Sequence, residues 1–247
     1  MGCFERLKIT ATLLAIILFS SIIHGRTPLN IKELKSGDAS WGINPSLDSS
    51  INLEKAWSNF SLNKEIVVAV VDTGIDPNHP YLKNNLYING GSEKASLSNF
   101  GLDFSKGQAT RLRPTDSHGH GTHISGIIRS VFPKVKLLTL KYYNPKATEQ
   151  DNLESTIAAL EYAVDSNVDI INYSSGGAGA SLAELRVLKK ALDKGILVVA
   201  AAGNYGANID KIRNHYYPAS YGLKNIITVI NHDQTIGLNS SSNYGKN

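Results

Sequence analysis

The stretch Ile66-Val67-Val68-Ala69-Val70-Val71-Asp72 is a continuous apolar run, rich in β-branched residues, that ends in a carboxylate. A strand that is apolar on both faces belongs inside a parallel sheet, with helices covering either side. In such sheets the ligand lies beyond the carboxyl ends of the strands. The run therefore predicts an α/β fold and places Asp72 where chemistry is expected.

Segments around this run alternate between strand and helix patterns. Strands are predicted at 135–140, 168–172, 196–201 and 226–230, and helices at 51–60, 152–165 and 181–194. This alternation predicts a mostly parallel central sheet flanked by helices on both faces. At the start of the last helix, Ser181 and Glu184 have the spacing of a capping box. Its apolar stripe is predicted to consist of Leu182, Leu185, Leu188 and Leu192.

The composition is that of a globular protein. The chain has 247 residues, 42% of them apolar and 19% charged, enough for one sizeable domain. Its net charge of +4 is scattered and forms no dense basic run. Nucleic acid is therefore not an expected partner.

The N-terminus has the layout of a secretory signal peptide. Arg6 and Lys8 precede an apolar run from Ile9 to Ile23 that is short for a membrane span. We expect a signal peptide at 1–25, a short segment at 26–40 and one domain at 41–247. A retained N-terminal anchor is the alternative. With cleavage, the protein would be secreted or periplasmic, with no stable membrane association.

Cysteine chemistry is excluded from the mature chain. Cys3 is the only cysteine, and it would leave with the signal peptide. No disulfide, reactive thiol or zinc–thiolate site would then remain.

The segment Asp116-Ser-His-Gly-His-Gly-Thr-His123 gathers three histidines and admits three interpretations. Together with Asp116, the histidines could ligate a metal. His118 and His123 could instead be buried, hydrogen-bonded residues without chemistry. His120 could be a general base, because the segment after it predicts a helix and Asp72 could fix its tautomer. These residues alone leave the choice open.

Three ordered blocks resemble the subtilisin-like serine proteases. They are Val70-Val-Asp-Thr-Gly-Ile-Asp76, His120-Gly-Thr-His-Ile-Ser-Gly126 and Ala201-Ala-Gly-Asn204. The segment Ile171-Asn-Tyr-Ser-Ser-Gly-Gly177 resembles the substrate-cleft block of that family. The segments Tyr217-Pro218 and Ser242-Asn-Tyr-Gly245 fit further landmarks, so the resemblance runs from about Trp41 to the last residue.

The resemblance implies roles for individual residues. Asp72 would orient His120, the general base, and Asn204 would donate its amide to the oxyanion. His118 inherits no role. Two segments would form the walls of the main specificity pocket and bind polypeptide substrates; their residues are Ser174, Ser175, Gly176, Ala202 and Gly203.

The sequence also departs from the family. No Gly-Thr-Ser-x-Ala block, which holds the family's nucleophile, occurs in these residues. We therefore expect a secreted serine endopeptidase whose domain is incomplete at the C-terminus; the alternative is an inactive, peptide-binding relative. We also expect no chaperone-like prodomain between the predicted signal peptide and Trp41. Tyr81 stands where many relatives carry an acidic calcium ligand, so neither a metal nor another cofactor is predicted, although calcium elsewhere stays open.

Overall fold

The computed structural model describes residues 41–44, 46–59, 64–88, 100–105 and 113–246. The predicted signal peptide at 1–25 and the segment 26–40 lie outside the described residues. Within the described ranges, no helix is long and apolar enough to cross a membrane.

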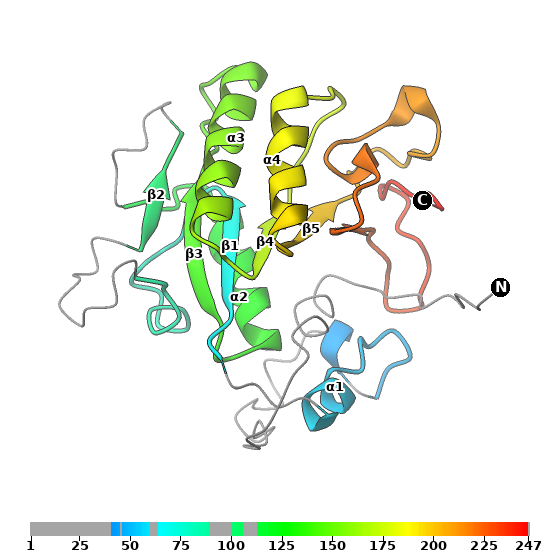
Figure 1. Ribbon diagram of the computed structural model, residues 1–247. Helices are drawn as coiled ribbons and strands as arrows, with labels where there is room; N and C mark the ends of the chain where they lie inside the picture. Colours follow the sequence, from blue (N-terminus) through cyan, green and yellow to red (C-terminus); the bar gives the residue numbers. More distant parts are fainter. Residues whose placement is uncertain (1–40, 45, 60–63, 89–99, 106–112, 247) are drawn as a thin grey trace.

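The core of the fold is a parallel sheet of six strands in the order β2-β3-β1-β4-β5-β6 (Figure 1). The strands are β1 (Val67–Asp72), β2 (Gly101–Asp103), β3 (Lys136–Lys141), β4 (Ile170–Tyr173), β5 (Leu197–Ala201) and β6 (Ile226–Val229). β1 lies between β3 and β4, and Val68 to Val71 are fully buried. The predicted interior strand and parallel sheet are confirmed.

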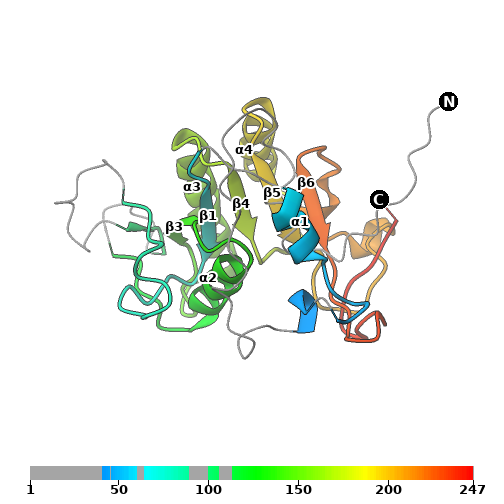
Figure 2. The ribbon, with the colours of Figure 1, turned by 90° about the horizontal axis from the view of Figure 1, so that it is seen from below.

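Helices cover both faces of this sheet, as predicted. α3 (Glu149–Asp165) and α4 (Leu182–Asp193) pack on the face that presents Ala69 and Val71. α2 (His120–Val131) and the short α1 (Leu53–Asn59) pack on the face that presents Val68 and Val70. Figures 1 and 2 show α3 and α4 on one side of the sheet and α2 on the other. Three short 3-10 helices complete the described elements: η3 (Trp41–Ile43), η4 (Ile212–Asn214) and η5 (Ala219–Tyr221).

Two α-helices begin or pack differently from the prediction. α3 begins at Glu149, one turn before the predicted start, because Thr148 and Asp151 form a reciprocal capping box. In α4 only half of the predicted box forms, since Ser181 Oγ accepts from the backbone N–H of Glu184 while the Glu184 carboxylate turns inward. Leu182 is 72% exposed, so it was wrongly assigned to the buried stripe, and Glu184 takes the inward position.

The strand register brings three carboxyl ends to one level. Val70 of β1 pairs with Asn172 of β4, which pairs with Val199 of β5. Two residues further on, Asp72, Ser174 and Ala201 therefore reach the same edge of the sheet. Neighbouring strands lie about 4.8 Å apart, so this edge gathers the predicted site residues within roughly 10 Å along the sheet.

Candidate active site

Asp72 and His120 meet at the carboxyl edge of the sheet. Asp72 ends β1, His120 begins α2, and the Nδ1 atom of His120 lies 2.7 Å from Oδ1 of Asp72. The same oxygen accepts a hydrogen bond of 2.7 Å from the backbone N–H of Thr73. The Asp72 side chain is 4% exposed and that of His120 is 42% exposed. A buried carboxylate thus holds an imidazole whose outer side faces solvent.

This contact fixes the tautomer of a neutral His120. An ionised carboxylate can only accept hydrogen bonds, so the ring proton lies on Nδ1. The opposite nitrogen, Nε2, then carries a lone pair and can take a proton from a nearby group. Asp72 also stabilises the imidazolium that this transfer creates. The pair has the geometry of an oriented general base.

A close approach of two backbones makes this pairing possible. A β carbon at Gly121 would lie 2.2 Å from the carbonyl oxygen of Gly74, so only glycine fits in the first turn of α2. The N–H of Gly121 donates to Thr73 Oγ1 at 2.9 Å, and the N–H of Asp76 donates to Thr122 Oγ1. The turn after β1 and the start of α2 therefore form one hydrogen-bonded unit.

Asp116 organises the loop that leads into α2, a role that the sequence did not reveal. Its Oδ1 accepts from Thr73 Oγ1 and from the N–H groups of His118 and Gly119, and its Oδ2 accepts from the N–H and hydroxyl of Thr122. Partial burial alone would raise the pKa of Asp116, but these donors hold that pKa well below its ordinary value. An aspartate that binds the N–H groups two and three residues later forms an Asx turn, so a turn residue at this position was the available signal.

The other two histidines are not buried, so that expectation was wrong. His118 is exposed, and its ring contacts those of Tyr143 and His120 edge-on, with centroids 5.7 and 6.3 Å apart. His123 is exposed because α2 turns other residues toward the sheet: Gly121, Ser125, Ile128 and Val131. Among the described residues, no group of three or more His, Cys, Asp or Glu side chains could hold a metal ion.

The segments predicted to bind substrate follow β4 and β5. Within the described ranges, the backbone groups of Ser174, Ser175 and Gly176 make no hydrogen bonds with other backbone groups. Asn204 follows β5, and its exposed side-chain amide has no hydrogen-bond partner in the described part of the chain. A cavity of about 220 Å³ lies at this edge and is lined by Asn172, Ser174, Ala201, Gly203, Asn204 and Ser242, among others.

Asn243 fixes the loop that carries Asn204, another role that the sequence did not reveal. Its side chain donates to the carbonyl of Ala202 and accepts from the N–H groups of Tyr205 and Ala207, while its own N–H donates to Gly203. Asn243 is 1% exposed, so these bonds are shielded from water. In the sequence, only the resemblance of this segment to a family landmark indicated that Asn243 could matter.

Two serines near the end of the sequence, Ser241 and Ser242, have hydroxyls that hydrogen-bond to nearby groups of the chain. Ser242 is 2% exposed, and its hydroxyl donates to the carbonyl of Asn243 and accepts from the N–H of Asn231. That of Ser241 donates to Asn239 Oδ1. Neither hydroxyl has the environment of an activated nucleophile.

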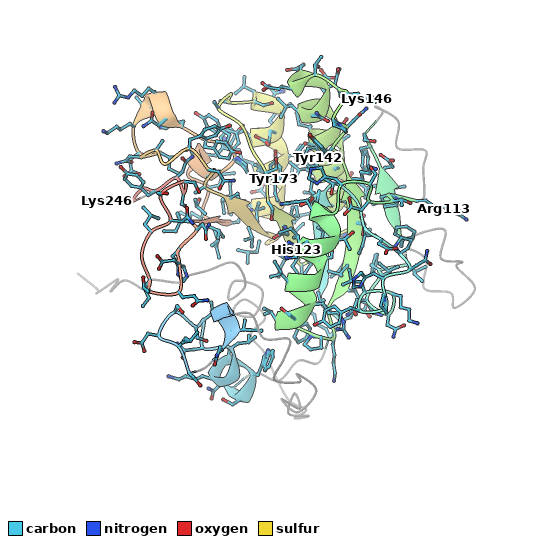
Figure 3. All side chains as sticks on the ribbon, turned by 180° about the vertical axis from the view of Figure 1, so that it is seen from behind. Arg113, His123, Tyr142, Lys146, Tyr173 and Lys246 are labelled. Atoms are coloured by element: carbon cyan, nitrogen blue, oxygen red, sulfur yellow. The ribbon has the colours of Figure 1, made fainter. Side chains whose placement is uncertain are left out.

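Two tyrosines, the half-buried Tyr142 and the buried Tyr173, lie next to each other at the carboxyl edge of the sheet (Figure 3). Tyr142 follows β3, and its N–H donates to the carbonyl of Asp72. Its ring meets that of Tyr173 at 6.5 Å, edge-on. Burial raises the pKa of Tyr142 to about 12 and that of Tyr173 well above its ordinary value, although a hydrogen bond with Ser175 opposes the shift of Tyr142. Both hydroxyls are therefore neutral at physiological pH.

A larger cavity, of about 510 Å³, lies at the opposite edge of the sheet. Its lining comes mainly from the amino ends of β4 and β5 and includes Lys64, Asp169, Lys194 and Lys224. None of the predicted site residues lines it, so volume alone does not identify the candidate site here.

Curated proteins are similar to this chain in sequence. The chain is 35% identical over 181 residues to the major intracellular serine protease of Bacillus subtilis strain 168, covering 69% of this chain and 53% of that protein. It is 29% identical over 180 residues to subtilisin DY of Bacillus licheniformis, covering 69% and 58%. The chain thus spans about half the length of these curated relatives.

Solved structures show the same architecture. A lanthipeptide protease superposes with a TM-score of 0.59 at 26% identity, over 73% of this chain and 52% of the other. An epidermin leader peptide processing serine protease from Staphylococcus aureus shares the fold, with a TM-score of 0.63 at 22% identity over 83% and 55%. A protein-family model described as the subtilase family matches residues 63–247. The chain belongs to the subtilase family.

Proposed function

We propose that this chain supplies the Asp–His pair and the oxyanion donor of a serine endopeptidase. The observation that carries the proposal is the 2.7 Å contact between buried Asp72 and the outward-facing His120. Membership of the subtilase family supports the same reaction class. The serine nucleophile would come from a Gly-Thr-Ser-x-Ala segment that is not part of these 247 residues.

Each group would have one task in peptide-bond hydrolysis. Nε2 of His120 would take the proton of the serine hydroxyl as the oxygen attacks the peptide carbonyl. Asp72 would stabilise the imidazolium, which then passes the proton to the leaving amine. The free side-chain amide of Asn204 would donate to the negative oxygen of the tetrahedral intermediate. A water molecule would then attack the acyl-enzyme in the same way: it would give its proton to His120, and the serine would be released with that proton.

The backbone after β4 would hold the substrate. The unpaired groups of Ser174, Ser175 and Gly176 could accept an extended peptide as an added strand. Backbone pairing is independent of side chains, so it suits a broad polypeptide substrate. The segment with Ala202 and Gly203 would form the facing wall.

The test is proteolysis by the product of the complete reading frame that encodes these residues. Casein hydrolysis should fall by about 10⁴-fold or more in His120→Ala, because no other group takes the serine proton. His123→Ala is the matched control, since this exposed histidine lies on the same helix, and it should retain activity. Undiminished hydrolysis by His120→Ala would refute the proposal.

An inactive, peptide-binding relative is the second candidate, favoured by the absence of the nucleophile block from this sequence. A fluorophosphonate probe separates the two, because it labels only an activated serine. Labelling of the complete protein that depends on His120 supports the enzyme. Peptide binding without labelling supports the second candidate.

Secretion and the absence of a cofactor also remain proposals. The basic and apolar N-terminal segments support export, whereas the relative from Bacillus subtilis is named intracellular. N-terminal sequencing of protein from culture medium and from cells decides between these locations. At the position of the expected calcium ligand, the ring of Tyr81 lies 3.8 Å beneath the Arg129 guanidinium. We therefore expect a chelator to leave this part of the structure unchanged.

A further inference from the structure

The ring of Tyr216 lies between the two segments proposed to hold the substrate. A β carbon at Gly176 would come within 2.6 Å of Cε1 of Tyr216, and one at Gly203 within 3.1 Å of both Cδ atoms. The aromatic ring therefore touches the backbone of both segments. Because Gly176 and Gly203 have no side chain, the ring of Tyr216 can pack directly against their backbone.

Several contacts hold this ring in place. The N–H of Tyr216 donates to Ser220 Oγ at 3.0 Å, and its carbonyl accepts from the N–H of Ser220 at 2.8 Å. The next residue, Tyr217, exchanges two backbone hydrogen bonds with Gly177. The ring also packs on a small apolar cluster of Ala202, Ile209 and Ala219. Anchors on both sides thus fix the backbone from which the ring projects.

Tyr216 is half-buried, and its polar end is neutral. Burial raises the pKa of Tyr216, and the nearby hydroxyl of Tyr205 acts in the same direction. The hydroxyl thus stays uncharged across the physiological range, and the side chain acts as a neutral filler.

We propose that Tyr216 is a specificity-determining residue that fills the space between the two walls and restricts the substrate residue before the scissile bond to Gly, Ala or Ser. This inference rests on the proposed function, because it takes the segments at Ser174–Gly176 and Ala202–Gly203 as substrate walls. A larger side chain would have to displace a ring held by packing on both sides. One methylene that a hydrophobic pocket cannot accommodate changes selectivity by about 10- to 200-fold, so exclusion of a larger side chain should change it by about 10-fold or more.

Peptide binding tests this inference without the need for a nucleophile. The probes are acetyl-Ala-Ala-Ala and acetyl-Ala-Ala-Phe carboxylates, which mimic the acyl half of a cleaved substrate. Their dissociation constants are measured by NMR titration of the ¹⁵N-labelled 247-residue chain, with the amides of Ser175 and Gly203 as reporters. We expect the Ala-ended peptide to bind at least about 10-fold more tightly than the Phe-ended one.

Variants assign the preference to the ring of Tyr216. Tyr216→Gly should tighten binding of the Phe-ended peptide by about 10-fold or more, whereas Tyr216→Phe, which keeps the ring, should retain the preference for Ala. Tyr81→Ala is the control, since it removes a tyrosine ring that packs beneath Arg129 and not against Tyr216. If the wild type binds both peptides equally, or if neither peptide shifts the reporter amides of the wild type or Tyr216→Gly, the inference is wrong.

One further variant separates this inference from the proposed catalysis. His120→Ala should keep the Ala-over-Phe preference in the binding assay, although it abolishes casein hydrolysis by the complete protein. Loss of catalysis with unchanged peptide selectivity supports both statements. Binding that shows the Tyr216 effect in a protein without His120-dependent hydrolysis supports the pocket and overturns only the proposed reaction.

Discussion

At the residue scale, the site depends on a carboxylate that does not touch the proposed reacting groups. Asp116 ties the end of β1 to the start of α2 by accepting hydrogen bonds on both of its oxygens. An amide at this position would replace one acceptor oxygen with an NH₂ group that faces donors. The resulting unpaired groups would loosen the turn that sets the distance between Asp72 and His120.

We therefore expect Asp116→Asn to lower the free energy of unfolding at pH 7 by about 1–3 kcal/mol, nearer the lower end because the carboxylate is partly exposed. The pKa of Asp116 lies below its ordinary value of 3.8 in the fold, so its stabilisation is complete above that value. It is lost as the pH falls toward the folded-state pKa. Urea unfolding at several pH values should show a difference from wild type that shrinks below about pH 4.

Asp233→Asn provides the matched control for this prediction. Asp233 also accepts several hydrogen bonds through one oxygen, from Thr235 and Gly237, but it does so in an exposed turn away from α2. Only the Asp116 variant should also lower casein hydrolysis by the complete protein. An equal loss of hydrolysis in both variants, or none in Asp116→Asn, would contradict the positioning role.

Some residues of the candidate site could be predicted from the sequence and others could not. Asp72 and His120 were predictable because each stands at the end of a recognisable element and belongs to a family block. The roles of Asp116 and Asn243 were not predictable, because their side chains hydrogen-bond to groups that come together only when separate segments of the chain fold. The same holds for Tyr216, whose position between two glycines arises only once the chain has folded.

At the scale of elements, strands were easier to predict than helix faces. The interior strands end within about two residues of their predicted bounds, because burial on both faces demands an unbroken apolar run. The short β2 at Gly101–Asp103 was missed, since three residues carry no pattern. In α4, leucine spacing placed Leu182 in the buried stripe, but Glu184 faces inward in its stead and meets the hydroxyl of Tyr221 at 2.8 Å, while Leu188 is buried as predicted.

The buried Glu184 makes the stability of α4 depend on pH. Burial raises the pKa of Glu184 above its ordinary value of 4.5, although hydrogen bonds from Tyr221 and Tyr173 oppose the shift. The native state therefore favours the protonated form, and this stabilisation, complete below pH 4.5, is lost as the pH rises through the folded-state pKa. Glu184→Gln, which cannot ionise, should be more stable than wild type at pH 8 by about 1 kcal/mol and similar to it at pH 4.

Thermal unfolding across this pH range measures the effect. Glu149→Gln is the control, because Glu149 also lies in the first turn of a helix but is exposed. It should cost only a few tenths of a kcal/mol through the helix dipole. A Glu184→Gln variant that is less stable than wild type at pH 8 would show that the hydrogen bonds of the carboxylate outweigh its desolvation.

At the scale of the whole molecule, the two faces and two edges of the sheet are covered unequally. α3 and α4 bury one face, whereas the residues of β6 remain half-buried. Within the described residues, β6 pairs only with β5, so its outer edge is open. The α/β pattern predicted helices on both faces, but the extent of coverage depends on tertiary contacts that periodicity does not encode.

The open edge continues into an apolar margin formed by Ile230, Ile236 and Leu238, which are 41%, 53% and 46% exposed. Open strand edges beside exposed apolar side chains favour pairing between molecules. We expect the 247-residue chain to self-associate through this margin, and the double variant Ile230→Lys/Leu238→Lys to lower the associated fraction severalfold in sedimentation velocity. Leu182→Lys is the matched control, because Leu182 is more exposed but lies on α4. Equal suppression by the control would mean that added charge alone prevents association, whereas suppression only by the double variant would locate the contact at the β6 edge.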